Sequence, residues 1–76
     1  MKADEFKRIR MKLEMNQEQF AELLGLSGFK AVSNIETGVR NPSRLTAIIL
    51  GVLDSLPKRK AEEFVELMQK QGAKRS

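Results

Sequence analysis

The 76-residue sequence contains no cysteine, no histidine, no tryptophan and no tyrosine. Without cysteine no disulfide can form, and without both cysteine and histidine the usual nucleophile, general base and transition-metal ligands are missing. The longest apolar run, 47–53, is far shorter than the roughly 20 residues that span a bilayer. The charged N-terminal segment lacks the apolar core of a signal peptide. We therefore expect no enzyme, no cofactor, no metal site and a cytoplasmic location.

The remaining composition is that of one small folded domain. Hydrophobic residues make up 41% of the chain and charged residues 32%, which is ordinary for a globular protein. A chain of this length has room for one core, so residues 1–76 are expected to form a single domain without a separate ligand-sensing part. The net charge of +4 is compatible with a polyanionic partner, although many small basic proteins share it.

Residues 16–38 have the pattern of two short helices joined by a tight turn. Asn16 and Gln19 have the spacing of a capping box, in which each side chain bonds the other residue's backbone amide. Gly25 suits the left-handed position that ends a helix, and Gly38 is expected to end the second helix. Helical periodicity predicts that Val32 and Ile35 of that second helix face inward. It places Phe29, Lys30, Ser33 and Asn34 on the outward side.

Helical patterns also cover the rest of the chain, so the predicted fold is all-α. A first helix is expected over 3–14, and a fourth from Pro42 to Ser55. Pro57 separates the latter from a last amphipathic helix over 58–71, and residues 72–76 are expected to fray. The 42–55 helix is apolar nearly all round, so either the last helix or a second subunit must cover its second face.

Two short helices joined by a glycine-containing turn make a helix-turn-helix. The segment from Phe6 to about Leu53 resembles the phage-repressor family, which includes Cro, the lambdoid repressors, Xre-type regulators and restriction-modification controller proteins. The residues that carry the resemblance are Arg10, Met15, Gln17, Phe20, Ala21, Leu24, Gly25, Leu26, Ser27, Val32, Ile35, Glu36, Gly38, Pro42 and Leu45. The chain departs from the family pattern by one extra residue near Gly28. The resemblance implies a compact five-helix domain of the lambda-repressor type, in a bacterial or phage-infected cell.

The resemblance also implies roles for individual residues. Arg10, which falls beside an apolar stripe, is expected to form a structural ion pair with Glu36. Lys30 suits guanine and Asn34 suits adenine in the major groove. Phe29 either contacts a thymine methyl group or turns into the core. The full set of expected base contacts is Phe29, Lys30, Ser33 and Asn34, and the expected phosphate contacts are Gln17, Ser27, Arg40, Asn41, Ser43 and Arg44.

The leading hypothesis is a sequence-specific regulator of transcription that binds double-stranded DNA. It is expected to be a homodimeric repressor of a palindromic or near-palindromic operator, without a small-molecule effector. The alternatives are an antitoxin or a protein-interaction module on the same scaffold. The dimerisation helices are expected within 43–71, with the contact made by Leu50, Leu53, Phe64 and Met68, unless the last two helices pack only on each other.

Overall fold

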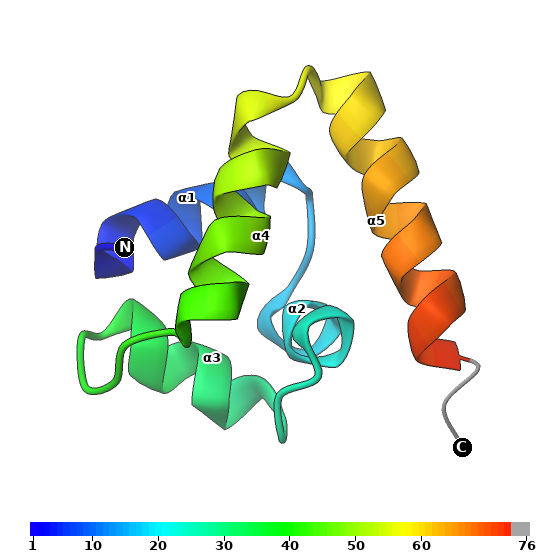
Figure 1. Ribbon diagram of the computed structural model, residues 1–76. Helices are drawn as coiled ribbons and strands as arrows, with labels where there is room; N and C mark the ends of the chain where they lie inside the picture. Colours follow the sequence, from blue (N-terminus) through cyan, green and yellow to red (C-terminus); the bar gives the residue numbers. More distant parts are fainter. Residues whose placement is uncertain (74–76) are drawn as a thin grey trace.

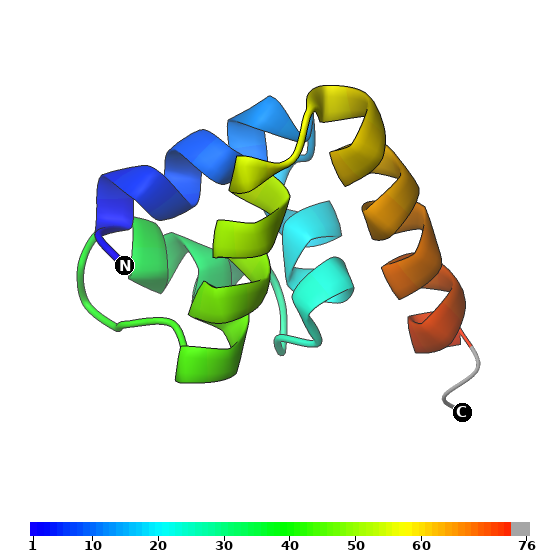
Figure 2. The ribbon, with the colours of Figure 1, turned by 45° about the horizontal axis from the view of Figure 1, so that its top comes forward.

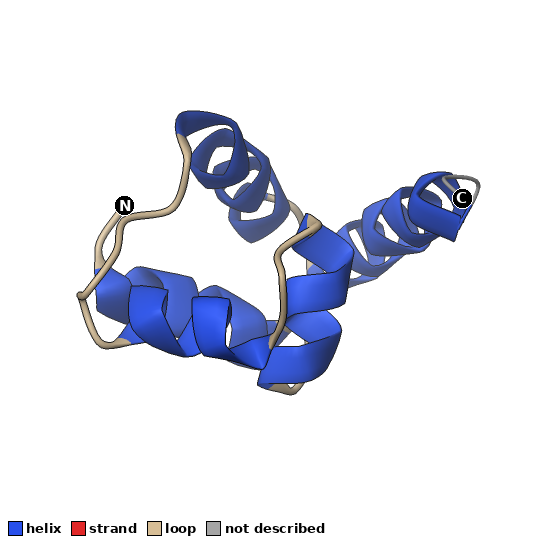
Figure 3. Ribbon diagram, turned by 90° about the horizontal axis from the view of Figure 1, so that it is seen from below, coloured by secondary structure: helices blue, strands red, loops and turns tan. Residues whose placement is uncertain are grey.

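The computed structural model describes residues 1–73, and these form helices and connecting loops without any strand (Figure 1; Figure 3). The all-helical prediction is confirmed. The five helices are α1 (Ala3–Lys12), α2 (Gln17–Leu24), α3 (Phe29–Glu36), α4 (Arg44–Ser55) and α5 (Lys58–Ala73). In that described part no helix has both the length and the apolar character needed to cross a bilayer. The last helix was expected to end at residue 71, with 72–76 frayed; Gly72 and Ala73 belong to α5, so this prediction is wrong for them, and 74–76 lie outside the described chain.

The core is a single apolar cluster to which every helix contributes two residues. Phe6 of α1 and Phe20 of α2 lie at its centre, with ring centroids 5.1 Å apart and an angle of 68° between the rings. This edge-to-face arrangement is the favourable one for aromatic pairs. The buried set is Phe6, Ile9, Phe20, Ala21, Val32, Ile35, Leu50, Leu53, Ala61 and Val65.

The capping box predicted at the start of α2 is present. The backbone amide of Gln19 donates to Asn16 Oδ1 at 2.8 Å, and the amide of Asn16 donates to Gln19 Oε1 at 3.0 Å. The two bonds satisfy amides that the first turn of a helix leaves without partners. These two bonds fix the start of α2 at Gln17.

The first three helices end in the same left-handed motif. After α1 the amide of Met15 donates to the carbonyl of Arg10, and that of Glu14 donates to Met11, which is the Schellman pattern. Gly25 and Gly38 hold the left-handed position after α2 and α3, with φ of 70° and 82°. At the end of α1 the same position is held by Glu14, with φ of 57°. A glutamate is an unusual residue there, because its Cβ crowds the backbone.

The helices pack so that α3 lies at one edge of the molecule. In Figure 1, α3 runs along the lower edge, α4 rises from the end of the loop that follows it, and α5 stands on the far side of α2. The turned view of Figure 2 shows α1 lying across the top of the molecule and the α2–α3 turn reaching downward. Helix α3 packs on α1 and α2, and α5 packs on α2 and α4.

Three further sequence-based expectations need correction. Helix α1 ends at Lys12 rather than continuing to residue 14, because the Schellman turn stops it. Helix α4 begins after Pro42, since the side chain of Ser43 accepts the amide of Thr46 at 3.2 Å and caps the first turn.

The third correction concerns the dimer contact expected at Leu50 and Leu53. Both side chains are completely buried within the single chain, so neither is available on its surface to a second subunit. Phe64 and Met68 of α5 are partly accessible, and their expected role stays a prediction. The side of α4 that faces solvent instead carries Leu45, Ile48 and Val52.

Candidate nucleic-acid interface

The outward face of α3 carries the four residues expected to contact bases. Val32 and Ile35 point into the core, and this fixes the rotation of the helix about its axis. Lys30 is exposed, while Ser33 and Asn34 are half-buried at the rim of the same face. Since residues three and four apart share one side of a helix, Lys30, Ser33 and Asn34 form one polar surface.

Phe29 opens α3 on the solvent side. Its side chain is 56% exposed, so the alternative in which it joins the core is excluded. An exposed aromatic ring at the first position of a helix is available for a flat apolar contact such as a thymine methyl group. The ring contributes little to the stability of this monomer, because more than half of it remains in water.

The turn between α2 and α3 contains Gly28, beside which the resemblance implies one extra residue. Leu26 packs against the core, and its amide donates to the carbonyl of Ala21 at 2.8 Å. Gly28 then leads into α3 with an extended backbone, φ 162° and ψ −177°. Val32 is buried in α3, so the turn that contains Gly28 is compatible with the two-helix unit, and the extra residue itself stays a prediction.

An ion pair ties the end of α3 to the end of α1. Arg10 Nε lies 2.6 Å from Glu36 Oε2, and its Nη2 donates to the other carboxylate oxygen at 3.2 Å. The two side chains are only 13% and 6% exposed. Arg10 Nη1 also donates to the carbonyl of Met15 at 2.9 Å, in the link between α1 and α2. The pair that the resemblance implies is thus embedded in a network.

Gln17 joins this network from the first position of α2. Its Nε2 donates to Glu36 Oε1 at 3.2 Å, so one amide hydrogen is already bonded within the chain. The amide group has a second N–H and a carbonyl oxygen, which leaves it further hydrogen-bonding capacity. The expected phosphate contact of Gln17 stays a prediction, and it would be made beside a carboxylate whose charge Arg10 balances.

The loop between α3 and α4 presents further cationic and polar residues. Arg40, Asn41 and Arg44 are exposed, and the backbone amide of Arg40 donates to the carbonyl of Asn34 at 3.1 Å. This bond anchors the loop to the last turn of α3. Ser43 uses its hydroxyl to cap α4, and Ser27 is exposed in the α2–α3 turn.

Sequence reasoning passed over two exposed residues of this region. Thr37 directly follows α3, and its hydroxyl donates to the carbonyl of Ser33 at 3.0 Å. Val39 begins the loop and is largely solvent-exposed. Neither carries a charge or a motif that could have singled it out, because an exposed threonine or valine in a loop is common.

Comparison with known protein families identifies the two-helix unit formed by α2 and α3. A family model described as helix-turn-helix matches residues 6–51, which is more than half of the chain. The chain belongs to the Cro/C1-type, Xre-like helix-turn-helix family. Comparisons with curated proteins and with solved structures found no match.

Membership of the Cro/C1-type family identifies the role of the two-helix unit as DNA binding. Helices α2 and α3 are the helix-turn-helix, and the protein is a DNA-binding regulator of transcription from a family that is generally non-enzymatic. In helix-turn-helix proteins the second helix of the unit lies in the major groove. In this Cro/C1-type chain that helix is α3, whose outward face carries Phe29, Lys30, Ser33 and Asn34.

Proposed function

We propose that the protein is a sequence-specific repressor that binds a palindromic or near-palindromic operator as a homodimer. The observation that carries this proposal is the outward face of α3. That face joins a cation, an amide and an exposed ring on a helix whose other side is fixed by buried Val32 and Ile35. A rigidly oriented helix with such side chains suits reading base edges better than forming a dry protein contact.

In the proposed complex the outward face of α3 enters the major groove. Lys30 donates to guanine O6 or N7, and Asn34 forms the paired donor and acceptor bonds that adenine N6 and N7 allow. Ser33 contacts whichever base edge lies between them, and Phe29 packs on a thymine methyl group. Each good bidentate contact discriminates against a wrong base by about 1–3 kcal/mol.

The phosphate contacts are proposed on both sides of α3. Arg40 and Arg44, both exposed, flank the C-terminal end of α3 and neutralise phosphates on one strand. Gln17, at the N-terminal end of α2, holds a phosphate with the help of the free backbone amides there. The remaining members of the set are Ser27, Asn41 and Ser43.

Two copies are needed because one α3 reads only a few base pairs. A two-fold dimer places its recognition helices about 34 Å apart, one turn of DNA, and therefore prefers an inverted repeat. We propose that protein concentration rather than a small-molecule effector sets the occupancy of the operator. Repression follows if the operator overlaps a promoter in the cytoplasm of a bacterial or phage-infected cell.

Selection of bound fragments from random duplex DNA at physiological salt tests the proposal. We expect an enriched inverted repeat with half-sites about one helical turn apart. If no sequence is enriched, the proposal fails and a protein-interaction module or an antitoxin becomes the better explanation.

A matched pair of variants separates base contacts from phosphate contacts. Asn34→Ala should relax discrimination at one position in each half-site, whereas Arg44→Ala should weaken binding to all sequences alike and reduce the salt slope by about 1 per site. Identical behaviour of the two variants would contradict the assignment.

A further inference from the structure

The loop between α3 and α4 is tied to α3 by hydrogen bonds that meet at one carbonyl group. The carbonyl oxygen of Asn34 accepts the backbone amide of Val39 at 2.9 Å and that of Arg40 at 3.1 Å. The hydroxyl of Thr37 donates to the same oxygen at 3.3 Å and to the carbonyl oxygen of Ser33 at 3.0 Å. Three donors therefore converge on the backbone of a residue that is proposed to read a base.

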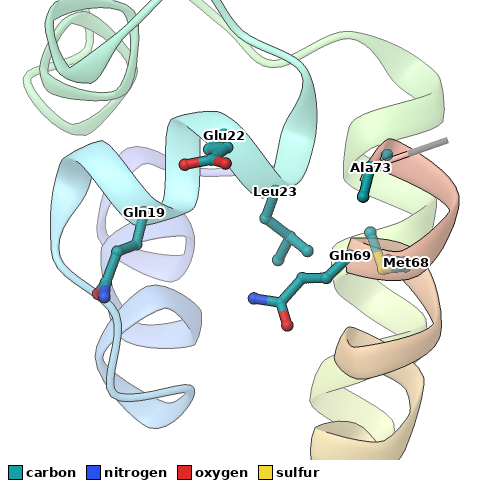
Figure 4. A pocket seen from close by; sticks show the side chains of 7 residues that line it. Gln19, Glu22, Leu23, Met68, Gln69 and Ala73 are labelled. Carbon is teal, nitrogen blue, oxygen red and sulfur yellow. The ribbon is translucent and has the colours of Figure 1, made fainter. Parts of the chain in front are cut away.

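Burial of side chains does not hold this loop in place. Residues 37–41 are all exposed, and Val39 is 72% exposed. In a Schellman turn the residue at the place of Val39 often packs on an apolar residue of the last helical turn, but the residue there is Asn34. An apolar groove of the described chain lies elsewhere, between α2 and α5, where Leu23 and Met68 face each other (Figure 4), and no residue of the loop lines it. The position of the loop therefore depends on its hydrogen bonds.

The hydroxyl of Thr37 is committed to the chain itself. A threonine hydroxyl has one hydrogen to donate, and both of its acceptors here are backbone carbonyls, those of Ser33 and Asn34. A hydrogen bond from this hydroxyl to a phosphate would have to replace these bonds. Any effect of the hydroxyl on DNA binding is therefore expected to pass through the loop.

The loop connects two contacts of the proposed complex. Arg40 is proposed to neutralise a phosphate, and its backbone amide is bonded to the carbonyl of Asn34. In Figure 1 the loop leaves α3 at the left and turns back to the start of α4. The bonds at the Asn34 carbonyl thus set the spacing between a base contact and a phosphate contact. A loop without these bonds would have to be ordered on binding, which lowers affinity.

We propose that Thr37 is a positioning residue for DNA binding, whose hydroxyl closes the last turn of α3 and thereby holds Arg40 in place for its phosphate contact. The inference rests on the phosphate contact proposed for Arg40 and adds the residue on which that contact depends. Thr37 acts through the loop and does not itself touch DNA.

Three variants separate this role from a general effect on stability. Thr37→Val removes the hydroxyl and keeps a β-branched side chain, whereas Thr37→Ser keeps the hydroxyl. Ser55→Ala is the matched control, because the Ser55 hydroxyl donates to the carbonyl of Val52 at 2.8 Å at the end of α4. Both are exposed bonds from a hydroxyl to a carbonyl at the end of a helix, so Thr37→Val and Ser55→Ala should lower the melting temperature by similar amounts.

Fluorescence anisotropy of a labelled duplex of arbitrary sequence, between about 50 and 200 mM salt, gives the affinity and its salt dependence. We expect Thr37→Val to weaken binding about two- to tenfold, the range that corresponds to one net hydrogen bond. It should also reduce the salt slope, as Arg40→Ala does. Thr37→Ser should restore both quantities, and Ser55→Ala should change neither.

The double variant Thr37→Val/Arg40→Ala tests whether the hydroxyl acts through Arg40. We expect it to bind like Arg40→Ala alone within about twofold, because no guanidinium is left to position. Losses that multiply would overturn the inference, since the hydroxyl would then act independently of Arg40.

Other results would also overturn the inference: Thr37→Val that binds like the unaltered chain, Thr37→Ser that fails to restore binding, or Ser55→Ala that weakens it equally. Unchanged binding by Arg40→Ala would overturn it too, and would identify the phosphate contact itself as the error. The duplex is not an operator, so none of these outcomes depends on the enrichment of an inverted repeat. Failure here is therefore distinct from failure of the proposed operator binding.

Discussion

Replacing Arg10 by methionine tests how the helix-turn-helix is held to the rest of the domain. The substitution keeps an unbranched side chain of similar length but removes both bonds to Glu36 and the bond to the Met15 carbonyl. Glu36 would then keep a charge in a site where its side chain is 6% exposed, with one bond from Gln17 remaining. Breaking a buried pair from one side costs about 3–5 kcal/mol. A domain of this size has roughly 5 kcal/mol in total, so Arg10→Met should be close to unfolding.

The double variant Arg10→Met/Glu36→Leu distinguishes two causes of the lost stability, the uncompensated charge of Glu36 and the loss of packing. It removes the stranded carboxylate and should recover most of the loss, leaving a deficit of about 1 kcal/mol for the unbonded Met15 carbonyl. Urea unfolding followed by circular dichroism gives the free energy of unfolding of the single and the double variant. The control is Arg8→Met, which removes the exposed ion pair with Asp54 and should have a smaller effect. If the double variant is as unstable as Arg10→Met alone, the stranded charge is not the cause and the reasoning is refuted.

Three further outcomes are expected. Glu14→Gly should raise the free energy of unfolding by about 1 kcal/mol, because glycine accepts the left-handed φ of 57° without strain. The exposed ion pair with Lys58 that is lost contributes little to stability. An unchanged urea midpoint would contradict this prediction. The hydrogen bonds from Arg8 lower the pKa of Asp54, so the stability that they add is present above pH of about 4 and is lost as pH falls through the lowered pKa. Asp54→Asn should remove that part of the acid dependence in melting experiments across pH. Gly38→Ala should lower the melting temperature, since alanine at φ of 82° is strained by about 1 kcal/mol, and an unchanged value would show that the α3–α4 loop can rearrange.

Local signals in the sequence were sufficient for much of the fold. The capping box of Asn16 and Gln19, the left-handed Gly25 and Gly38, and the inward Val32 and Ile35 each depend on a few neighbouring residues, and all are present. Such features are predictable because a side chain and a backbone group within one turn determine them.

Other features depend on contacts between distant segments, and the sequence pattern left them open or misplaced them. Glutamate has no preference for the left-handed conformation, so nothing indicated that Glu14 would end α1. Periodicity identified two apolar faces on α4 but could not rank them, because the one that packs on the core is chosen by α1 and α5. Leu50 and Leu53 were consequently assigned to the wrong side. The exposure of Phe29 was likewise left open, because periodicity does not describe how the α2–α3 turn leads into α3.

The Arg10 guanidinium lies outside residues 16–38 and bonds Glu36 of α3 and the carbonyl of Met15, which precedes α2. The bihelical unit is consequently not a transplantable module: an excised peptide of residues 16–38 would lose the guanidinium and the Phe6 ring that packs on Phe20 of α2. Grafting this two-helix unit onto another scaffold therefore requires a recipient that supplies its own cation beside Glu36, since without one the buried carboxylate keeps only the bond from Gln17.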